Sequence, residues 1–151
     1  MTKTEWADDP CPIARSLGVL GERWSMLIVR DAMLGSTRFS EFRTSLGIAP
    51  DILSARLTAL VAAGVFETVE YREPGARRRR RYELTTAGRE LSTILASLAQ
   101  WARTHLPPAE DNQNRFVDTM SQQQVLPCLR RSDGRLVDPA DAVLVTPTAV
   151  N

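Results

Sequence analysis

The spacing of the apolar residues changes at Gly64, and this change restricts the possible folds more than any other feature of the sequence. Before Gly64, apolar residues recur at steps of three and four, which is typical of amphipathic helices. From Val65 to Arg72, and again from about Arg79 to Leu84, apolar and polar residues alternate, which is typical of strands. A turn sequence, Glu-Pro-Gly-Ala at 73–76, separates the two runs. The sequence therefore predicts several helices followed by one β-hairpin.

Four helices are expected before the hairpin, and the third and fourth are joined by about three residues. Pro12 suits a first helical turn, and Thr37 suits an N-cap. The expected ranges are 12–20, 24–34, 38–46 and 50–63, with glycines at 21, 47 and 64 as ends. The side chains expected to point inward are Trp24, Leu27, Ile28, Leu34, Phe39, Phe42, Leu46, Leu53, Leu57, Leu60 and Val61.

One long helix is expected after the hairpin, from Thr85-Thr86 to just before Pro107-Pro108. Its apolar seam, at steps of three and four, consists of Leu91, Ile94, Leu95, Leu98 and Trp101. This seam is larger than a small helical lobe must cover, so it predicts dimerisation, although a buried helix in a monomer would give the same pattern. The remainder carries short apolar pieces that could be brief strands or an adaptable arm.

The predicted fold class is mainly α with a β-hairpin wing, in the order of a winged helix-turn-helix with a long C-terminal dimerisation helix. We expect residues 1–106 to form the DNA-binding and dimerisation domain, and residues 107–151 to form a C-terminal extension of unknown role. In this fold the second helix of the turn lies in the major groove of double-stranded DNA. The fourth predicted helix would therefore read bases.

The charge of the chain is concentrated in the predicted wing. The net charge is only +1, but five of the 19 basic residues are adjacent: Arg77, Arg78, Arg79, Arg80 and Arg81. Adjacent arginines repel one another unless an anionic partner compensates them, although a solvated surface hairpin would look the same. Because alternate strand residues point to opposite sides, two or three arginines per subunit could reach a phosphate backbone. DNA binding should then weaken steeply with salt. For a dimer, the slope of log affinity against log salt concentration should be about −4 or steeper.

If the apolar stripe of the fourth predicted helix faces the core, then Asp51, Ser54 and Arg56 face the DNA. Asp51 can accept a hydrogen bond from a cytosine amino group, and Arg56 can contact a phosphate or a guanine, although a surface arginine is an equally simple interpretation. The predicted DNA contacts are Thr37, Arg38, Pro50, Asp51, Ser54, Arg56, Arg77, Arg78, Arg79, Arg80 and Arg81.

The composition argues against several other classes of protein. No apolar run approaches the roughly 18 to 20 residues that span a bilayer, and the first residues lack the apolar core of a signal peptide, so we expect a cytoplasmic protein without membrane contact. Two cysteines are too few for a secreted disulfide framework or a self-contained zinc site. With His105 as the sole histidine and no nucleophile motif, we expect no enzyme, no metal and no cofactor.

Several motifs in unbroken order resemble the HxlR-type transcriptional regulators, relatives of the MarR-like group. They span about residues 10–105 and are Cys11-Pro-Ile-Ala, Gly21-Glu-Arg-Trp-Ser, Arg38-Phe-Ser-Glu-Phe, Ile52-Leu-Ser-Ala-Arg-Leu, Ala63-Gly-Val and Tyr82-Glu-Leu-Thr-Thr-Ala-Gly. The resemblance implies homodimers, assembled through the first and last helices, that bind pseudo-palindromic operators. Two departures stand out: Ala49 replaces the serine N-cap frequent in the family, and the wing is unusually basic.

Cys11 is the candidate redox sensor. It lies just before the first helix, where free amides and the positive end of the helix dipole stabilise a thiolate. Asp8 and Asp9 oppose this effect, and Arg15 favours it. The resemblance implies the same role, since the matching cysteine senses oxidants in several relatives; a structural cysteine at the dimer seam is the alternative. Cys128 could resolve an oxidised Cys11 in the same or the partner subunit, or could belong to a packed apolar piece.

A small-molecule effector is a second regulatory possibility. It would occupy a pocket between the DNA-binding lobe and the long helix, lined by Trp24, Phe42, Trp101 and Tyr82, although aromatic residues at helical spacing are more often core. A protein-interaction winged helix or an RNA-binding module without operator specificity remains the alternative function, because fold does not fix function. Preference for a promoter duplex over random DNA and RNA distinguishes the two.

Overall fold

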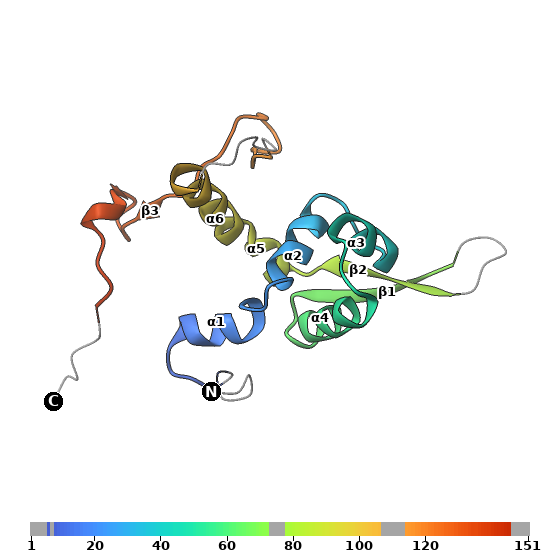
Figure 1. Ribbon diagram of the computed structural model, residues 1–151. Coiled ribbons are helices and arrows are strands. Elements are labelled where there is room, and N and C mark those ends of the chain that lie inside the picture. The colour runs from blue at the N-terminus through green and yellow to red at the C-terminus, as the bar shows by residue number, and fades with distance from the viewer. Residues whose placement is uncertain (1–5, 7, 73–77, 107–113, 146–151) are drawn as a thin grey trace. The chain divides into compact units, whose positions relative to one another are not determined.

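The computed structural model describes residue 6 and residues 8–72, 78–106 and 114–145 (Figure 1). The chain divides into two compact units, Met1–Leu95 and Ala96–Asn151. This division falls inside the helix α6 (Ser92–His105), whereas the domain boundary predicted from the sequence follows residue 106 and stays a prediction. Among the described residues, no helix is long and apolar enough to cross a membrane.

The first unit begins with the four expected helices: α1 (Pro12–Leu20), α2 (Ser25–Met33), α3 (Phe39–Leu46) and α4 (Pro50–Ala62). α3 ends at Gly47, which has a φ of 61° and so adopts the left-handed conformation that glycine tolerates best. Pro50 opens α4, because its missing N–H would have no intrahelical partner there. The short connection between α3 and α4 predicted from the sequence is confirmed.

The start of α3 differs from the prediction in one detail. The N-cap is Arg38 rather than Thr37, and the Glu41 side chain accepts hydrogen bonds from backbone amides at this helix start. Oε2 of Glu41 accepts hydrogen bonds from the backbone amides of Thr37, at 2.7 Å, and Arg38, at 2.9 Å. These bonds lower the pKa of the Glu41 carboxyl below its ordinary value. Thr37 is unavailable as a cap because its carbonyl accepts a hydrogen bond from the Tyr82 amide of the hairpin.

The predicted hairpin is formed by β1 (Phe66–Tyr71) and β2 (Arg79–Leu84). The strands are antiparallel, in a register that pairs Phe66 with Leu84 and Tyr71 with Arg79. A single bridge between Arg38 and Arg81 adds the residue before α3 to the edge of β2. The hairpin extends away from the helices of its unit (Figure 1). The predicted turn at 73–76 lies outside the described residues.

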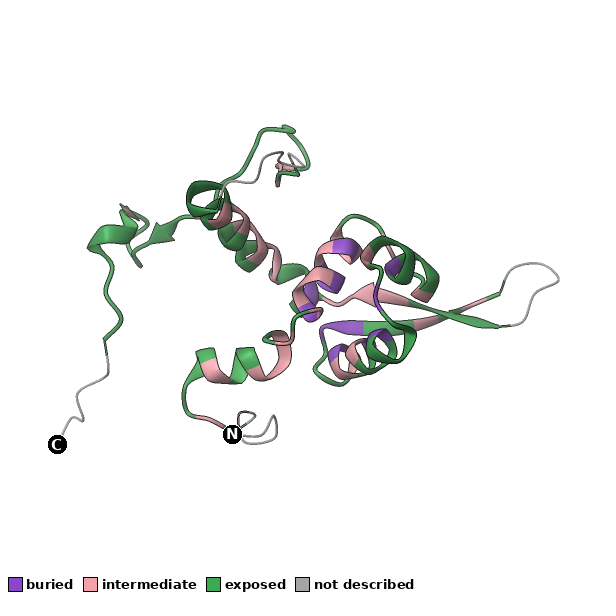
Figure 2. Ribbon diagram, viewed as in Figure 1, coloured by how far each residue is buried: buried purple, intermediate pink, exposed green. Residues whose placement is uncertain are grey.

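The core of the first unit lies between α2, α3, α4 and the start of β1 (Figure 2). The prediction for α4 is confirmed, because Leu53, Leu57 and Leu60 are fully buried. The prediction for Leu34 is wrong, because it follows the last residue of α2 and its side chain is 64% exposed. The buried apolar residues are Ile28, Val29, Phe42, Ile48, Leu53, Leu57, Leu60, Val65 and Phe66.

Where the sequence predicts one continuous helix after the hairpin, the structure has α5 (Thr86–Glu90) and α6 (Ser92–His105). At the break, the Leu91 amide donates to the carbonyl of Gly88, three residues back, in place of the four-residue α pattern. α5 lies very close to the residue before β1. A Cβ on Gly88 would be only 2.2 Å from the Val65 carbonyl oxygen, so a larger residue would not fit there without a shift of the backbone. The Thr85 hydroxyl also donates to the Gly64 carbonyl, at 2.6 Å.

The second unit contains most of α6 and the described part of the extension. The extension forms a small antiparallel hairpin whose two strands, β3 (Leu129–Arg130) and β4 (Leu136–Val137), have two residues each. A short 3-10 helix, η1 (Pro139–Asp141), follows it. The apolar piece at 125–129 thus reaches a brief strand, whereas 142–145 forms none. None of the described residues after Leu95 is buried.

Candidate nucleic-acid interface

The buried leucines of α4 determine which of its residues face solvent. Because Leu53, Leu57 and Leu60 pack into the core, the opposite side of the helix is exposed. Asp51 and Ser54, both predicted to face DNA, are exposed there, together with Ile52, Ala55 and Thr58. α4 therefore presents a short, mainly small and polar surface of the kind that enters a major groove.

The N-terminus of α4 provides backbone donors. Ala49 is the N-cap and makes no side-chain cap hydrogen bond, as expected from its methyl side chain. Pro50 has no N–H, so the unpaired donors are those of the next residues in the first turn. Backbone amides at a helix start, together with the helix dipole, favour a bound phosphate. The carboxylate of Asp51 in the same turn competes for that position.

Arg56 has a partner within the chain. Its Nη1 lies 3.2 Å from Oε1 of Glu22, in the connection between α1 and α2, and its side chain is only 22% exposed. An arginine that contacts DNA from this position must first separate from Glu22. The predicted DNA contact of Arg56 stays a prediction, and the structure adds an ion pair between α4 and the connection that follows α1.

The described arginines of the wing differ in their intramolecular partners. Arg81 is paired with Glu83 at 2.6 Å, whereas Arg78 lies 3.5 Å from Glu70, at the limit of a hydrogen bond. Among the described residues, no carboxylate forms an ion pair with Arg79 or Arg80, and both side chains are exposed. These two arginines are therefore the most available to an external anion. Arg77 lies outside the described residues.

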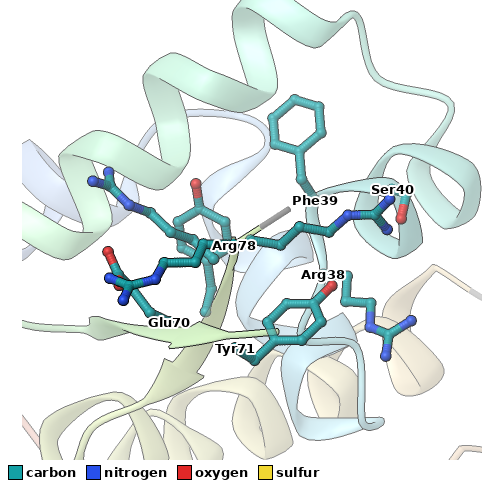
Figure 3. Close-up of a pocket in the computed structure, with 9 residues that line it drawn as sticks. Arg38, Phe39, Ser40, Glu70, Tyr71 and Arg78 are labelled. Carbon is teal, nitrogen blue, oxygen red and sulfur yellow. The ribbon is translucent and has the colours of Figure 1, made fainter. Parts of the chain in front are cut away.

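A groove is lined by residues at the start of α3 and by residues of the hairpin (Figure 3). The guanidinium carbon of Arg38 lies 5.2 Å from the centre of the Tyr71 ring, a cation–π arrangement. Figure 3 shows the Arg78 side chain extending across the groove, with Glu70 on the hairpin beside it. The groove is lined by Arg38, Phe39, Ser40, Glu70, Tyr71, Arg78, Arg79, Arg80 and Tyr82.

The structure thus brings two sets of predicted residues together and leaves others apart. Arg38 joins Arg78, Arg79 and Arg80 around one groove, which the linear sequence does not indicate. Sequence reasoning missed Tyr71 and Glu70 as site residues. The alternation of the first strand places Tyr71 opposite Arg79 in a hairpin, but the approach of Arg38 depends on its bridge to β2.

Cys11 is the N-cap residue of α1, and its side chain is an exposed free thiol. Its amide donates to Oδ1 of Asp9 at 2.8 Å. Arg15, expected to favour the thiolate, donates instead to the backbone carbonyls of Asp9, at 2.7 Å, and Pro10, at 3.1 Å. Cys128, in the second unit, is also an exposed free thiol.

Three of the aromatic residues expected to line an effector pocket lie in the first unit and Trp101 lies in the second, so the pocket stays a prediction. Phe42 is fully buried, edge-on to Phe66 in the core, and Tyr82 lines the groove at the wing. Trp24 is partly buried against the core, and Trp101 is 56% exposed on α6. Within the described ranges, no three potential ligands are grouped to hold a metal ion.

Helices α2, α3 and α4, followed by an antiparallel hairpin, form a winged helix-turn-helix. Residues 19–110 match the HxlR-like helix-turn-helix family. Because this match covers more than half of the chain, the protein belongs to that family. Cys11 precedes the matched residues.

Individual proteins are similar over different lengths. Rv3095 of Mycobacterium tuberculosis, an uncharacterized HTH-type transcriptional regulator, is 41% identical over 98 residues, 65% of this chain and 61% of Rv3095. The chain therefore matches less than two thirds of that relative. The crystal structure of PA1607, a candidate transcription factor, has a TM-score of 0.79 and 38% identity over 95% of this chain and 99% of PA1607. The redox regulator HypR in its reduced form has a TM-score of 0.56 and 27% identity, over 62% of this chain and 92% of HypR.

Proposed function

We propose that the protein is a transcriptional regulator that binds double-stranded DNA with sequence specificity. The observation that carries this proposal is the exposed, small and polar face of α4, held by buried leucines in a unit that also carries an arginine-rich strand, in a member of the HxlR-like family. Contacts to phosphates position a protein on DNA, whereas contacts to base edges specify the sequence. The wing arginines supply affinity, and Asp51 and Ser54 on α4 select bases.

We further propose that the regulator is a homodimer on a pseudo-palindromic operator. The support comes from apolar side chains that the single chain leaves exposed: Ile13 and Leu17 on α1, and Ile94, Leu98 and Trp101 on α6. Pairing these faces across a two-fold axis would remove them from water. Two recognition helices would then meet successive major grooves, roughly 34 Å apart.

The proposed function is tested by fluorescence anisotropy with the chain's own promoter duplex, a scrambled duplex and an RNA duplex at physiological salt. We expect tighter binding to the promoter by at least about a thousandfold, the lower end of the range of specific over non-specific DNA binding. The variant Ser54→Ala should reduce this preference, while Ser45→Ala, at another exposed serine, on α3 and outside the groove, should retain it. Equal affinity for all three nucleic acids would instead support a general interaction module.

Redox control through Cys11 is a second proposal, supported by its exposed thiol at a helix N-cap and by the similarity to HypR. A peroxide would oxidise the Cys11 thiol to a sulfenic acid and be reduced to water or an alcohol. Condensation of the sulfenic acid with the Cys128 thiol, of the same or the partner subunit, would release water and form a disulfide. The disulfide would change DNA affinity through the position of α1.

The variant Cys11→Ser separates this proposal from DNA binding itself. We expect it to bind promoter DNA normally and to keep that affinity after peroxide treatment, whereas the parent protein changes. Cys128→Ser should abolish the disulfide on a non-reducing gel but still allow sulfenic acid formation at Cys11. Equal responses of the parent and Cys11→Ser would exclude redox control through this residue.

A further inference from the structure

We propose that Tyr71 is a positioning residue for DNA binding: it holds the Arg38 guanidinium at the hairpin, so that α3 and the wing bind one DNA backbone together. The inference rests on the proposed function, because it assigns Arg38 to a DNA phosphate. Arg38 is the N-cap residue of α3, and Tyr71 is the last residue of β1 (Figure 3). The guanidinium carbon of Arg38 lies 5.2 Å from the centre of the Tyr71 ring, a distance at which the ring attracts a cation.

The strand register places these two side chains on the same face of the hairpin. Arg38 forms a bridge with Arg81, and Arg81 is paired with Val69. Directly opposed residues of neighbouring strands point to the same side, and so do residues two positions apart in one strand. Tyr71 is two positions after Val69 and therefore shares the side of Arg38. The stacking thus follows from the backbone pairing of the residue before α3 with the edge of β2.

The face that carries Tyr71 points away from the core of its unit. Phe66, at the start of the same strand, is buried, and residues an odd number of positions from it point to the opposite face. Among the described residues, Tyr82 packs against the core and Tyr71 does not. Tyr71 is nevertheless partly buried, so a neighbour outside the core covers it. Arg38 is the neighbour that the cation–π contact identifies.

The stack fixes the position of a flexible charge. An arginine side chain loses conformational entropy when it is immobilised on a ligand. Because Arg38 is already held by Tyr71, and its Nε lies 3.8 Å from Oε1 of Glu41, part of this ordering precedes the arrival of DNA. The Arg38 side chain remains 45% exposed, so a phosphate can still reach it. Tyr71 therefore raises DNA affinity without a contact of its own to DNA.

A second predicted DNA contact lies on the same face. Arg79 is directly opposite Tyr71 in the register and is exposed. An arginine from the start of α3 and an arginine from the wing are thus held beside one aromatic residue. Two positive charges in this arrangement repel each other, and a shared anion compensates them. The oxygens of a phosphate can accept hydrogen bonds from two guanidinium groups at once, which favours the DNA backbone as the common partner.

The test combines NMR of the free protein with anisotropy titrations of the promoter duplex at several salt concentrations. In the parent protein and in Tyr71→Phe, the Hδ and Hε protons of Arg38 should lie upfield of their random-coil values, because an aromatic ring shields protons above its face. Tyr71→Ile keeps a residue suited to a strand and should remove this shift. The same variant should bind the promoter about threefold more weakly, as expected for the loss of one exposed cation–π contact, and Tyr71→Phe should bind like the parent.

Two further variants make the effect specific to this pair. Thr68→Ile is the matched control, because it introduces the same residue in the same strand at an exposed position on the opposite face, and it should change affinity by less than about twofold. Arg38→Gln should weaken binding about tenfold and reduce the salt slope by about 2, one phosphate contact per subunit of a dimer. Tyr71→Ile added to Arg38→Gln should cause no additional loss, because the ring then has no cation to hold.

The outcomes separate the inference from the proposed function. If the parent protein binds the promoter, equal losses in Tyr71→Ile and Thr68→Ile would overturn the inference alone. An additional loss in the double variant would overturn it as well. Arg38 signals without an upfield shift in the parent would do the same even if Tyr71→Ile fails to fold. Absence of DNA binding by the parent, with the upfield shift present, would instead overturn the proposed function and confirm only the stacking.

Discussion

The helices around the hairpin and the segment after Leu95 use similar apolar residues in opposite ways. Every buried apolar side chain of the described chain lies between Ile28 and Phe66, whereas no described residue after Leu95 is buried (Figure 2). α4 hides Leu53, Leu57 and Leu60 completely, but α6 leaves Leu98 51% exposed. The apolar side chains of α4 therefore pack inside the unit, whereas several of those on α6 remain exposed.

This difference indicates which helices need a second surface to cover their apolar side chains. Residues 28–66 supply a core of their own, so the winged helix can hold its shape within one chain. α1 and α6 carry exposed apolar side chains without such a core, which supports the proposed homodimer. The similarity to PA1607 covers 95% of this chain, so it includes most of residues 107–151 and is not restricted to the winged helix.

The largest expected effect comes from the core. Leu57→Ala removes a fully buried side chain and should lower the free energy of unfolding by about 2–5 kcal/mol. Leu34→Ala is the matched control, since the same change at a 64% exposed leucine should cost less than about 0.5 kcal/mol. Urea unfolding followed by circular dichroism measures both. Similar losses in the two variants would break the distinction between buried and exposed apolar residues.

The next effect concerns α6. Leu98→Asp places a charge on the exposed apolar face and should raise the dimer dissociation constant at least tenfold, which corresponds to about 1.4 kcal/mol. Gln100→Asp adds the same charge on the other side of the helix, about 200° away at 100° per residue, and should leave the constant unchanged. Sedimentation velocity over a range of concentrations gives both constants. A monomeric parent protein would contradict the dimer altogether.

A smaller effect is expected in the wing, which belongs to the first unit but has no buried residue in β2. Arg80→Gln should make DNA binding about tenfold weaker at moderate salt and reduce the salt slope by about 2, one phosphate contact per subunit. Arg81→Gln should change the slope less, because Glu83 already compensates Arg81. Unfolding of both variants should match the parent. Anisotropy titrations at several salt concentrations measure the salt slope of each variant. A slope that neither substitution alters would contradict the predicted phosphate contacts of the wing.

The smallest effect is at the start of α3. Glu41→Ala removes the acceptor of two backbone amides and should lower the free energy of unfolding by about 0.5–1 kcal/mol at pH 7. Because the pKa of Glu41 is lowered in the folded protein, its contribution is present above the ordinary value of 4.5 and is lost as the pH falls through the folded pKa. Unfolding measured from pH 7 to pH 3 should show the difference shrinking, and a constant difference would exclude the carboxylate as its source.

Local patterns predicted much of the fold and part of the site. The change of period at Gly64 identified the hairpin, and the leucine spacing in α4 identified its buried side, because both depend on neighbours close in sequence. The break at Leu91 could not be predicted in this way. The break lies three residues after Gly88, which closely approaches Val65, and this contact joins residues that are distant in sequence.

The sequence by itself determined the order of helices and strands, the exposed face of α4 and the concentration of arginines in one strand. Only the tertiary structure decided how those arginines differ: Arg56 pairs with Glu22, Arg81 pairs with Glu83, and Arg38 joins Arg78, Arg79 and Arg80 around one groove. The physical reason is that helix and strand periods depend on burial along a short segment, whereas the partner of a charge depends on which distant segments the core brings together.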